Sequence, residues 1–313
     1  MVKNLVIAVE AVAPMFLIMV IGVLTRRAGL INEAETKRLN KLVFTVFFPP
    51  MMFDNLYGAE IGDAFDIKLI VYCLAMILAV IAVSALIILK IEKDNRTRGA
   101  MIQAIYRSNL VIMGLPLVSN IFGDENLTTT AVTIAIVVPA YNVLAVILLE
   151  FFRGGKPNAG QIIRGIFTNP LILGAIAGAL TIVLHIELPD FLESTISSMD
   201  AVATPMALLV LGASLNKKSL SHSWRNLIIC VSGRLIIVPA VALTLGALLG
   251  LRGIEFATMI PVFASPTGIS SYTMAAQMGS DGELAGNCVV FSSALSSLTL
   301  FFWIFLFKTL GMF

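Results

Sequence analysis

Two short polar segments lie inside apolar stretches that are long enough to cross a membrane. Arg107–Pro116 and Ala264–Tyr272 each combine proline and glycine with small polar side chains. Broken backbone at membrane depth leaves N–H and C=O groups unpaired, and it is tolerated only where it faces protein or a water-filled cavity. A helix that restarts after a break directs unpaired N–H groups, and the positive end of its dipole, at the break. The two segments therefore predict a binding site for an anion.

Side chains at and near the breaks are the candidates for substrate contact. Asn109 and Ser265 adjoin the breaks, where they bind substrate oxygens or only cap the broken backbone. Asn142 faces the crossing or makes an ordinary interhelical hydrogen bond. The prolines remove a backbone donor and so shape the site. The complete set for substrate binding is Asn109, Gly114, Pro116, Asn142, Ser265, Pro266, Thr267, Gly268 and Ser270.

Charged residues within the apolar stretches are few. Arg107 and Arg234 are the most deeply placed basic residues, and each either neutralises a bound anion or extends its long stem to the interface. Asp54 and Asp200 either relay a proton or are solvated carboxylates near an interface. Phe48, Pro49 and Met51 lie on the second apolar stretch. These residues either form a wall that the substrate passes, or they contact lipid or a second subunit.

The composition is that of a membrane protein that crosses the bilayer many times. Of 313 residues, 58% are hydrophobic and 13% charged, and the mean hydropathy is +0.95, whereas soluble domains carry about 25% charged residues. A net charge of +2 gives no basic field for nucleic acid. Cys73, Cys230 and Cys288 lie in apolar segments without metal-ligand spacing, so we expect buried thiols, no metal and no cofactor.

A helix that spans the bilayer needs about 20 mostly apolar residues, and the sequence offers ten such segments. We therefore predict an all-α integral membrane fold. The segments are Leu5–Thr25, Leu39–Tyr57, Ile67–Leu89, Arg98–Phe122, Leu127–Phe152, Ile162–His185, Phe191–Leu215, Trp224–Leu251, Glu255–Gly279 and Glu283–Phe313.

Charge alternates between the loops that connect these segments. Lys and Arg gather in the loops after the first, third, fifth and seventh segments, and they accumulate on the cytoplasmic side of membrane proteins. Both termini are therefore expected outside the cytoplasm. The basic loops contain Arg26, Arg27, Lys37, Arg38, Lys41, Lys90, Lys93, Arg96, Arg98, Arg153, Lys156, Arg164, Lys217, Lys218 and Arg225, and the acidic ones Glu60, Asp63, Asp66, Asp124, Glu125, Glu187, Asp190 and Glu193.

Five segments in each half predict an inverted repeat, because an odd number makes the second half enter from the opposite side. The predicted units are residues 1–152, a cytoplasmic linker at 153–161, and residues 162–313. The fourth and ninth segments are then broken helices that cross near the midplane, with Asn109 matching Ser265. Three residue pairs share the offset of 156: Pro14 and Pro170 (170 − 14), Pro49 and Pro205 (205 − 49), and Gly123 and Gly279 (279 − 123).

Four motifs in this order resemble those of the auxin efflux carrier family, and the similarity runs along the whole chain. They are Phe48-Pro49-Pro50, Arg107-x-Asn109 with Gly114-Leu115-Pro116 and Phe122-Gly123, Val138-Pro139-x-x-Asn142-Val143-Leu144, and Ser265-Pro266-Thr267-Gly268. Like the bacterial members often labelled malonate or malate permeases, the chain lacks the long central loop of the plant PIN-formed exporters.

The resemblance implies a fold like that of the bile acid:sodium symporters. Segments 1, 2, 6 and 7 would form a scaffold that dimerises, and segments 3–5 and 8–10 a moving unit that carries the crossing. Transport in such folds resembles an elevator, in which the moving unit slides past the scaffold.

The leading hypothesis is a secondary transporter of the cytoplasmic membrane for a small organic anion, such as a dicarboxylate or an auxin-like acid. The chain has no Walker motif, so the energy comes from an ion gradient, the membrane potential or the substrate gradient. H⁺ and Na⁺ both remain open as coupling ions. The alternatives are an anion channel that uses the same crossing, a receptor, and an intramembrane enzyme, which is disfavoured because no HExxH or GxSxG motif is present.

Overall fold

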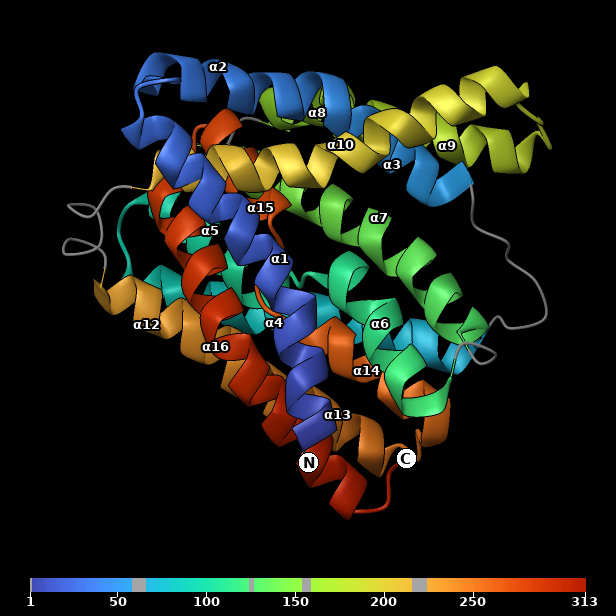
Figure 1. Ribbon diagram of the computed structural model, residues 1–313. Helices are drawn as coiled ribbons and strands as arrows, with labels where there is room; N and C mark the ends of the chain where they lie inside the picture. The colour runs from blue at the N-terminus through green and yellow to red at the C-terminus, as the bar shows by residue number, and fades with distance from the viewer. Residues whose placement is uncertain (1, 58–65, 124–126, 154–158, 216–223) are drawn as a thin grey trace.

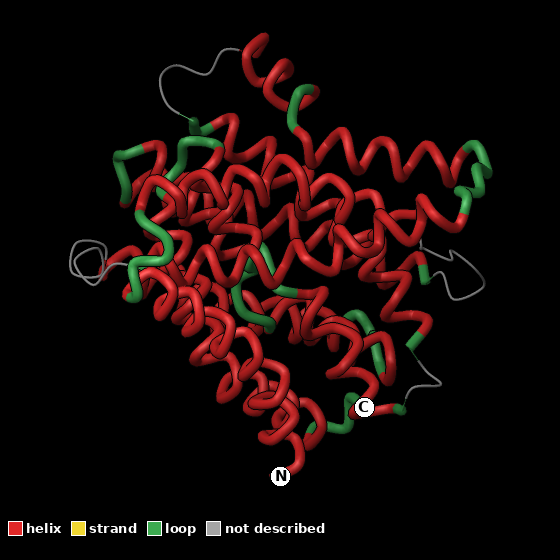
Figure 2. The backbone as a smooth tube through the Cα atoms, turned by 45° about the horizontal axis from the view of Figure 1, so that its top comes forward, coloured by secondary structure: helices red, strands yellow, loops and turns green. Residues whose placement is uncertain are grey.

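The computed structural model describes residues 2–57, 66–123, 127–153, 159–215 and 224–313, and these residues are helical apart from short connections (Figures 1 and 2). The loop charges at Glu60, Asp63, Asp124, Glu125, Lys156, Lys217 and Lys218 lie outside the described residues. The elements are α1 (Val2–Arg27), α2 (Glu33–Leu42), η1 (Val43–Phe47), α3 (Phe48–Tyr57), α4 (Ile67–Ile91), α5 (Asn95–Tyr106), α6 (Leu110–Phe122), α7 (Thr128–Phe151), α8 (Ala159–Phe167), α9 (Pro170–Val183), α10 (Asp190–Ser214), α12 (Trp224–Ser232), η3 (Gly233–Ile237), α13 (Val238–Leu248), α14 (Gly253–Ala264), α15 (Ser270–Gln277) and α16 (Gly282–Thr309).

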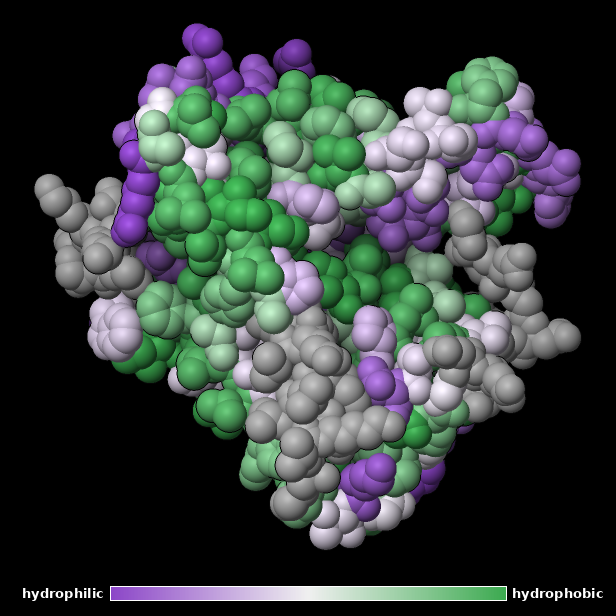
Figure 3. Space-filling view, viewed as in Figure 1, coloured by the Kyte–Doolittle hydropathy of each residue, from purple (hydrophilic) through white to green (hydrophobic). Residues whose placement is uncertain are grey.

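Five described helical runs are long and apolar enough to cross a membrane: Ile67–Ile91, Thr128–Phe151, Asp190–Ser214, Trp224–Leu248 and Gly282–Thr309. Shorter apolar helices accompany them at Leu110–Phe122, Pro170–Val183 and Gly253–Ala264. Apolar side chains cover much of the face in Figure 3, while hydrophilic ones gather over α2. Cys73, Cys230 and Cys288 are buried free thiols, as expected from the sequence.

Helices α2, η1 and α3 form one run that begins at Glu33, six residues before the predicted start at Leu39 (39 − 33). Asn32 accepts a hydrogen bond from the backbone of Glu35, and the Glu35 carboxylate accepts one from the backbone of Asn32. This capping box pairs two N–H groups that a helix start otherwise leaves free. The apolar criterion missed these turns because their side chains are polar.

The predicted continuous segment Ile162–His185 is wrong, because the helix breaks at Thr168 and Asn169. Helix α8 ends at Phe167, and α9 begins at Pro170. The Asn169 side chain accepts a hydrogen bond from the N–H of Leu171 at 3.0 Å. Proline at the first helical position has no N–H to leave unpaired, and Asn is a preferred cap, so a new helix starts here.

The fourth and ninth predicted segments are both interrupted, as expected. The first interruption separates α5 from α6 at 107–109, and the second separates α14 from α15 at 265–269. The first is shorter than predicted, because Gly114 and Pro116 lie inside α6. Gly123 and Gly279 follow α6 and α15 with φ values of +83° and +76°, a backbone region that glycine adopts without steric cost.

Helices α1, α3, α9 and α10 pack closely on one another. A Cβ atom at Gly22 would collide with the backbone of Leu209, and one at Gly212 with the backbone of Met19. The same applies to Gly174 of α9 against the carbonyl of Pro49 in α3. Small residues at such contacts let helix backbones approach, which is how helices associate in membranes.

The offset of 156 residues also relates the boundaries of the observed helices. Adding 156 to α4 gives 223–247, and the observed run of α12, η3 and α13 is Trp224–Leu248. Adding it to α7 gives 284–307, within the observed α16. Adding it to the run from Glu33 to Tyr57 gives 189–213, and α10 is Asp190–Ser214.

Candidate functional site

The two interruptions meet in space and bind each other through their backbones. Ser108 and Thr267 form an antiparallel bridge. The N–H of Asn109 donates to the carbonyl of Pro266 at 2.8 Å, and the N–H of Gly268 donates to the carbonyl of Arg107 at 3.3 Å. Backbone groups that the helix breaks leave unpaired are therefore satisfied by the opposite break.

Gly268 is required by this close approach. A Cβ atom at this position would lie 3.0 Å from the carbonyl oxygen of Ser108, which is backbone and cannot rotate away. Thr267 fixes the same loop, because its N–H donates to the Ser292 hydroxyl at 3.0 Å and its hydroxyl donates to the carbonyl of Ala104 at 2.9 Å. Hydrogen bonds to α5 and α16 therefore hold the crossing, in addition to those between its own two segments.

Arg234 binds the ends of the two helices that stop at the crossing. Its guanidinium is fully buried and donates to four carbonyls, those of Ile105 (3.3 Å) and Tyr106 (3.0 Å) in α5, and Val262 (3.0 Å) and Ser265 (2.7 Å) at the end of α14. Helix C-termini carry negative partial charge. The donors of Arg234 therefore serve the protein backbone, and its role as a counter-charge for the anion stays a prediction.

Arg107 has different surroundings. Its side chain is 3% exposed and donates to Asn142, to the Ser270 hydroxyl at 2.6 Å and to the sulfur of Met274 at 2.6 Å. All three are neutral, and thioether sulfur is a weak acceptor. The ion pairs among the described residues are Lys37 with Glu33 and Arg153 with Glu150, so within that part of the chain Arg107 has no carboxylate partner.

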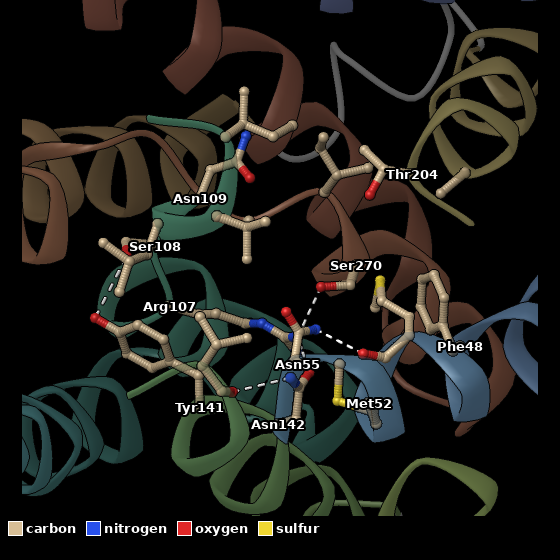
Figure 4. Close-up of a pocket in the computed structure, with 18 of the residues that line it drawn as sticks. Phe48, Met52, Asn55, Arg107, Ser108, Asn109, Tyr141, Asn142, Thr204 and Ser270 are labelled. Carbon is tan, nitrogen blue, oxygen red and sulfur yellow. Dashed lines mark hydrogen bonds between the residues drawn. The ribbon is translucent and has the colours of Figure 1, made fainter. Parts of the chain in front are cut away.

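A cavity of about 230 Å³ opens beside the crossing (Figure 4). Its wall includes Arg107, the first residues of α6, and Gly268–Ser270 at the start of α15. The positive end of a helix dipole favours an anion, so the starts of α6 and α15 and the guanidinium act in the same sense. The lining residues are Phe48, Met51, Met52, Asn55, Arg107, Ser108, Asn109, Leu110, Val111, Ile112, Val138, Tyr141, Asn142, Asp200, Ala201, Thr204, Ala207, Gly268, Ile269 and Ser270.

Half of the predicted site residues line this cavity. These are Asn109, Asn142, Gly268 and Ser270 of the binding set, Arg107 of the counter-charges, and Phe48 and Met51 of the wall. Asn109 is the residue before α6, yet its side chain makes no capping hydrogen bond. Its amide nitrogen lies 3.7 Å from the sulfur of Met15. The capping alternative for Asn109 is therefore not what the geometry shows.

The other predicted residues do not line the cavity. Pro116 is on the exposed side of α6, Gly114 packs against Ile134, and Pro49 directs its carbonyl at α9. Ser265, Pro266 and Thr267 are buried and hold the crossing together through their backbones or, for Thr267, also its hydroxyl. Residues next to a break therefore support the crossing as often as they line the cavity.

Several lining residues were not identified as binding residues from the sequence. Asn55 lies seven residues after Phe48 and shares its helix face, a spacing that was open to detection. Tyr141 precedes Asn142; its hydroxyl donates to the carbonyl of Val262 at 3.0 Å and accepts from Ser108 at 3.4 Å. Asp200 and Thr204 of α10 complete the group. Nothing in the sequence brings α10 to this crossing, because the contact is tertiary.

A second cavity, of about 900 Å³, lies between α2 and the pair α15 and α16. Its lining includes Arg26, Lys41, Asn40, Gln277 and Asn287. Asn40 is buried, and its amide oxygen has no hydrogen-bond partner among the described residues. None of the residues of the two interruptions lines this second cavity.

A helical membrane protein with a polar cavity at two facing helix breaks belongs to the class of membrane transporters. The model of the membrane transport protein family matches residues 7–304. The chain belongs to this family, that of the auxin efflux carriers.

Relatives along nearly the whole chain agree with this assignment. An uncharacterised transporter of Methanothermobacter thermautotrophicus is 25% identical over 299 residues, which cover 94% of this chain and 96% of the relative. An uncharacterised transporter of Methanocaldococcus jannaschii is 23% identical over 308 residues, which cover 95% and 98%. These names indicate a transporter rather than an enzyme.

Proposed function

We propose that the protein is a secondary carrier that moves a small organic anion, a carboxylate, across the cytoplasmic membrane. The observation that carries this proposal is Arg107, a buried guanidinium on the cavity wall that has no carboxylate partner among the described residues. A charge buried at membrane depth without a partner is costly. A bound carboxylate removes that cost, and the planar guanidinium matches its two oxygens.

The helix starts and the cavity volume support a small anionic ligand. The first N–H groups of α6 and α15 lie at the same wall as Arg107. The volume of about 230 Å³ is below the roughly 300–1,000 Å³ of pockets for drug-sized ligands. The substrate is therefore a compact acid rather than a large amphiphile.

We further propose ten membrane crossings as two inverted five-helix repeats, with α5–α6 and α14–α15 as the broken, crossing pairs. The common offset of 156 residues, the alternating loop charges, and the position of both chain ends at one end of the molecule support this arrangement (Figure 1). With basic loops in the cytoplasm, both termini are extracytoplasmic.

An elevator-type motion is the proposed mechanism. The scaffold consists of α1, α2–α3, α8–α9 and α10, and the moving unit of α4–α7 and α12–α16. The cavity lies between the two, since Phe48 and Thr204 belong to the scaffold whereas Arg107 and Asn142 belong to the moving unit. In this mechanism the second cavity, between α2 and the pair α15 and α16, would give access from the other side of the membrane. Two scaffolds pair in a homodimer, and an H⁺ or Na⁺ gradient supplies the energy.

The test is transport by the purified protein in liposomes. A thermal-shift screen of small carboxylates, with and without Na⁺ and across pH, first finds a ligand; a hundredfold excess over Kd stabilises the protein by about 2.7 kcal/mol. Uptake of that acid should saturate and show counterflow, which a channel lacks. Arg107→Gln should abolish uptake, while Arg27→Gln, at an exposed position, should not. Normal uptake by Arg107→Gln would refute the proposal.

A further inference from the structure

We propose that the substrate is a zwitterion, a small amino acid, whose carboxylate is bound by Arg107 and whose ammonium group is bound by Asp200. The inference rests on the proposed carboxylate site, and it replaces the simple anion by a molecule that carries an ammonium group as well as a carboxylate. It follows from the charges that line the cavity beside the crossing.

The described lining residues include one cation and one anion. Arg107 is the cation, and Asp200 is the anion. Neither belongs to an ion pair among the described residues, so the two do not bind each other. A cavity with two opposite charges that are held apart is complementary to a molecule with the reverse arrangement, because each buried or half-buried charge then gains a partner.

The two charges come from different helices that face the cavity. Arg107 lies at the α5–α6 break, and Asp200 lies on α10, one turn before Thr204 on the same helix face. In Figure 4, the Arg107 guanidinium lies beside Ser270 and Asn142, and Thr204 is drawn apart from it. Asp54 on α3 adds its negative field to that of Asp200. The α10 side of the cavity therefore favours positive charge.

Neutral acceptors are present for an ammonium group, which has three N–H donors. Thr204 contributes a hydroxyl to the lining. Asn55 uses its amide nitrogen on the carbonyl of Met51 at 2.7 Å, which leaves its amide oxygen as an acceptor. The lining also includes apolar side chains, among them Phe48, Met52 and Val111, which suit an aliphatic side chain.

A dicarboxylate fits this cavity less well. Its second carboxylate would meet Asp200, since the described lining residues hold no second cation. Like charges in one site repel. The family resemblance alone favours a dicarboxylate or an auxin-like acid, so the charge pair separates two kinds of substrate for the same crossing.

The experiment measures Kd by calorimetry for the purified full-length protein with acids that differ only in the amino group. The pairs are 2-aminobutyrate with butyrate and leucine with 4-methylvalerate, and N-acetylleucine and succinate complete the set. We expect the amino acids to bind at least about tenfold more tightly than their partners, which corresponds to about 1.4 kcal/mol. Acetylation should cancel the gain, because it removes the positive charge.

Asp200→Asn should lower the ratio of affinities within each pair to about one, while Asp190→Asn, at an exposed position on the same helix, should keep it. If carboxylates bind through Arg107 and the amino group adds nothing, or if succinate binds most tightly, the zwitterion is refuted and the carboxylate site stands. If binding survives Arg107→Gln, both are refuted. The comparison of ligands on the unmodified protein decides the question even if Asp200→Asn fails to fold.

Discussion

Replacement of Arg234 by methionine should destabilise the protein strongly without acting on the cavity directly. The guanidinium donates four hydrogen bonds to carbonyls at the ends of α5 and α14. These carbonyls have lost the usual helical donor: Pro266, four residues after Val262, has no N–H, and the N–H of Asn109, four residues after Ile105, is used by the opposite break. Arg234 takes the place of those donors.

The magnitude follows from the carbonyls that remain. Val262 keeps the hydroxyl of Tyr141 as a donor, so three carbonyls lose the donor that Arg234 supplied, at about 1–3 kcal/mol each. Methionine spares the protein the burial of a charge, which offsets part of that sum. We expect a net loss of about 3–5 kcal/mol, in the lower part of the sum for three unpaired carbonyls, and a drop in Tm of about 10 °C.

Thermal unfolding in detergent, followed by tryptophan fluorescence, measures this effect. Arg234→Lys keeps the charge with a single nitrogen in place of three, so its Tm should fall between those of the other two proteins. The residual folded fraction of Arg234→Lys should bind carboxylates with a Kd within about threefold of the original, unlike Arg107→Lys. A Tm of Arg234→Met within 2 °C of the original, on the order of a 1 kcal/mol change or less, would refute the reasoning.

Three further predictions concern packing, the crossing and pH. Gly212→Val should lower Tm, since even a Cβ collides with the backbone of α1, at a cost of about 1–3 kcal/mol or more; an unchanged Tm would contradict the close contact. Ser292→Ala should weaken carboxylate binding several-fold, because it leaves the N–H of Thr267 unpaired; an unaltered Kd would show that the loop is held otherwise. Burial raises the pKa of Glu92, but hydrogen bonds from two backbone N–H groups and Asn226 lower it overall. Its contribution to stability is therefore present at neutral pH and is lost as pH falls below 4.5, so the difference in Tm between Glu92→Gln and the original should shrink there.

The sequence predicted the helical membrane class and both interruptions because these depend on local chemistry. Apolar runs long enough to span a membrane can be recognised from the sequence alone, and proline and glycine disturb a helix wherever they occur. The family motifs could be recognised from the sequence for the same reason. Helix starts were harder to predict. The capping box at Asn32 and Glu35 begins a helix in polar residues, which a hydropathy criterion assigns to a loop.

For the site, the sequence predicted some of the lining residues and missed others. The spacing along the chain indicated Asn109, Asn142, Gly268 and Ser270, which line the cavity. It did not distinguish Arg107 from Arg234, since both are single arginines in apolar surroundings. The two arginines differ in their hydrogen-bond partners. Arg107 donates to neutral side chains beside a cavity, whereas Arg234 donates to four backbone carbonyls.

The sequence by itself therefore determined the class of protein, the two breaks and the prediction of an anion at their crossing, because composition and local backbone chemistry decide these features. Only the tertiary structure decided which side chains face the cavity. The direction of a side chain and the identity of its partner depend on helices distant along the chain, as with Asp200 of α10 at a crossing built by α5, α6, α14 and α15. That placement gives the described lining of the cavity two opposite charges, Arg107 and Asp200.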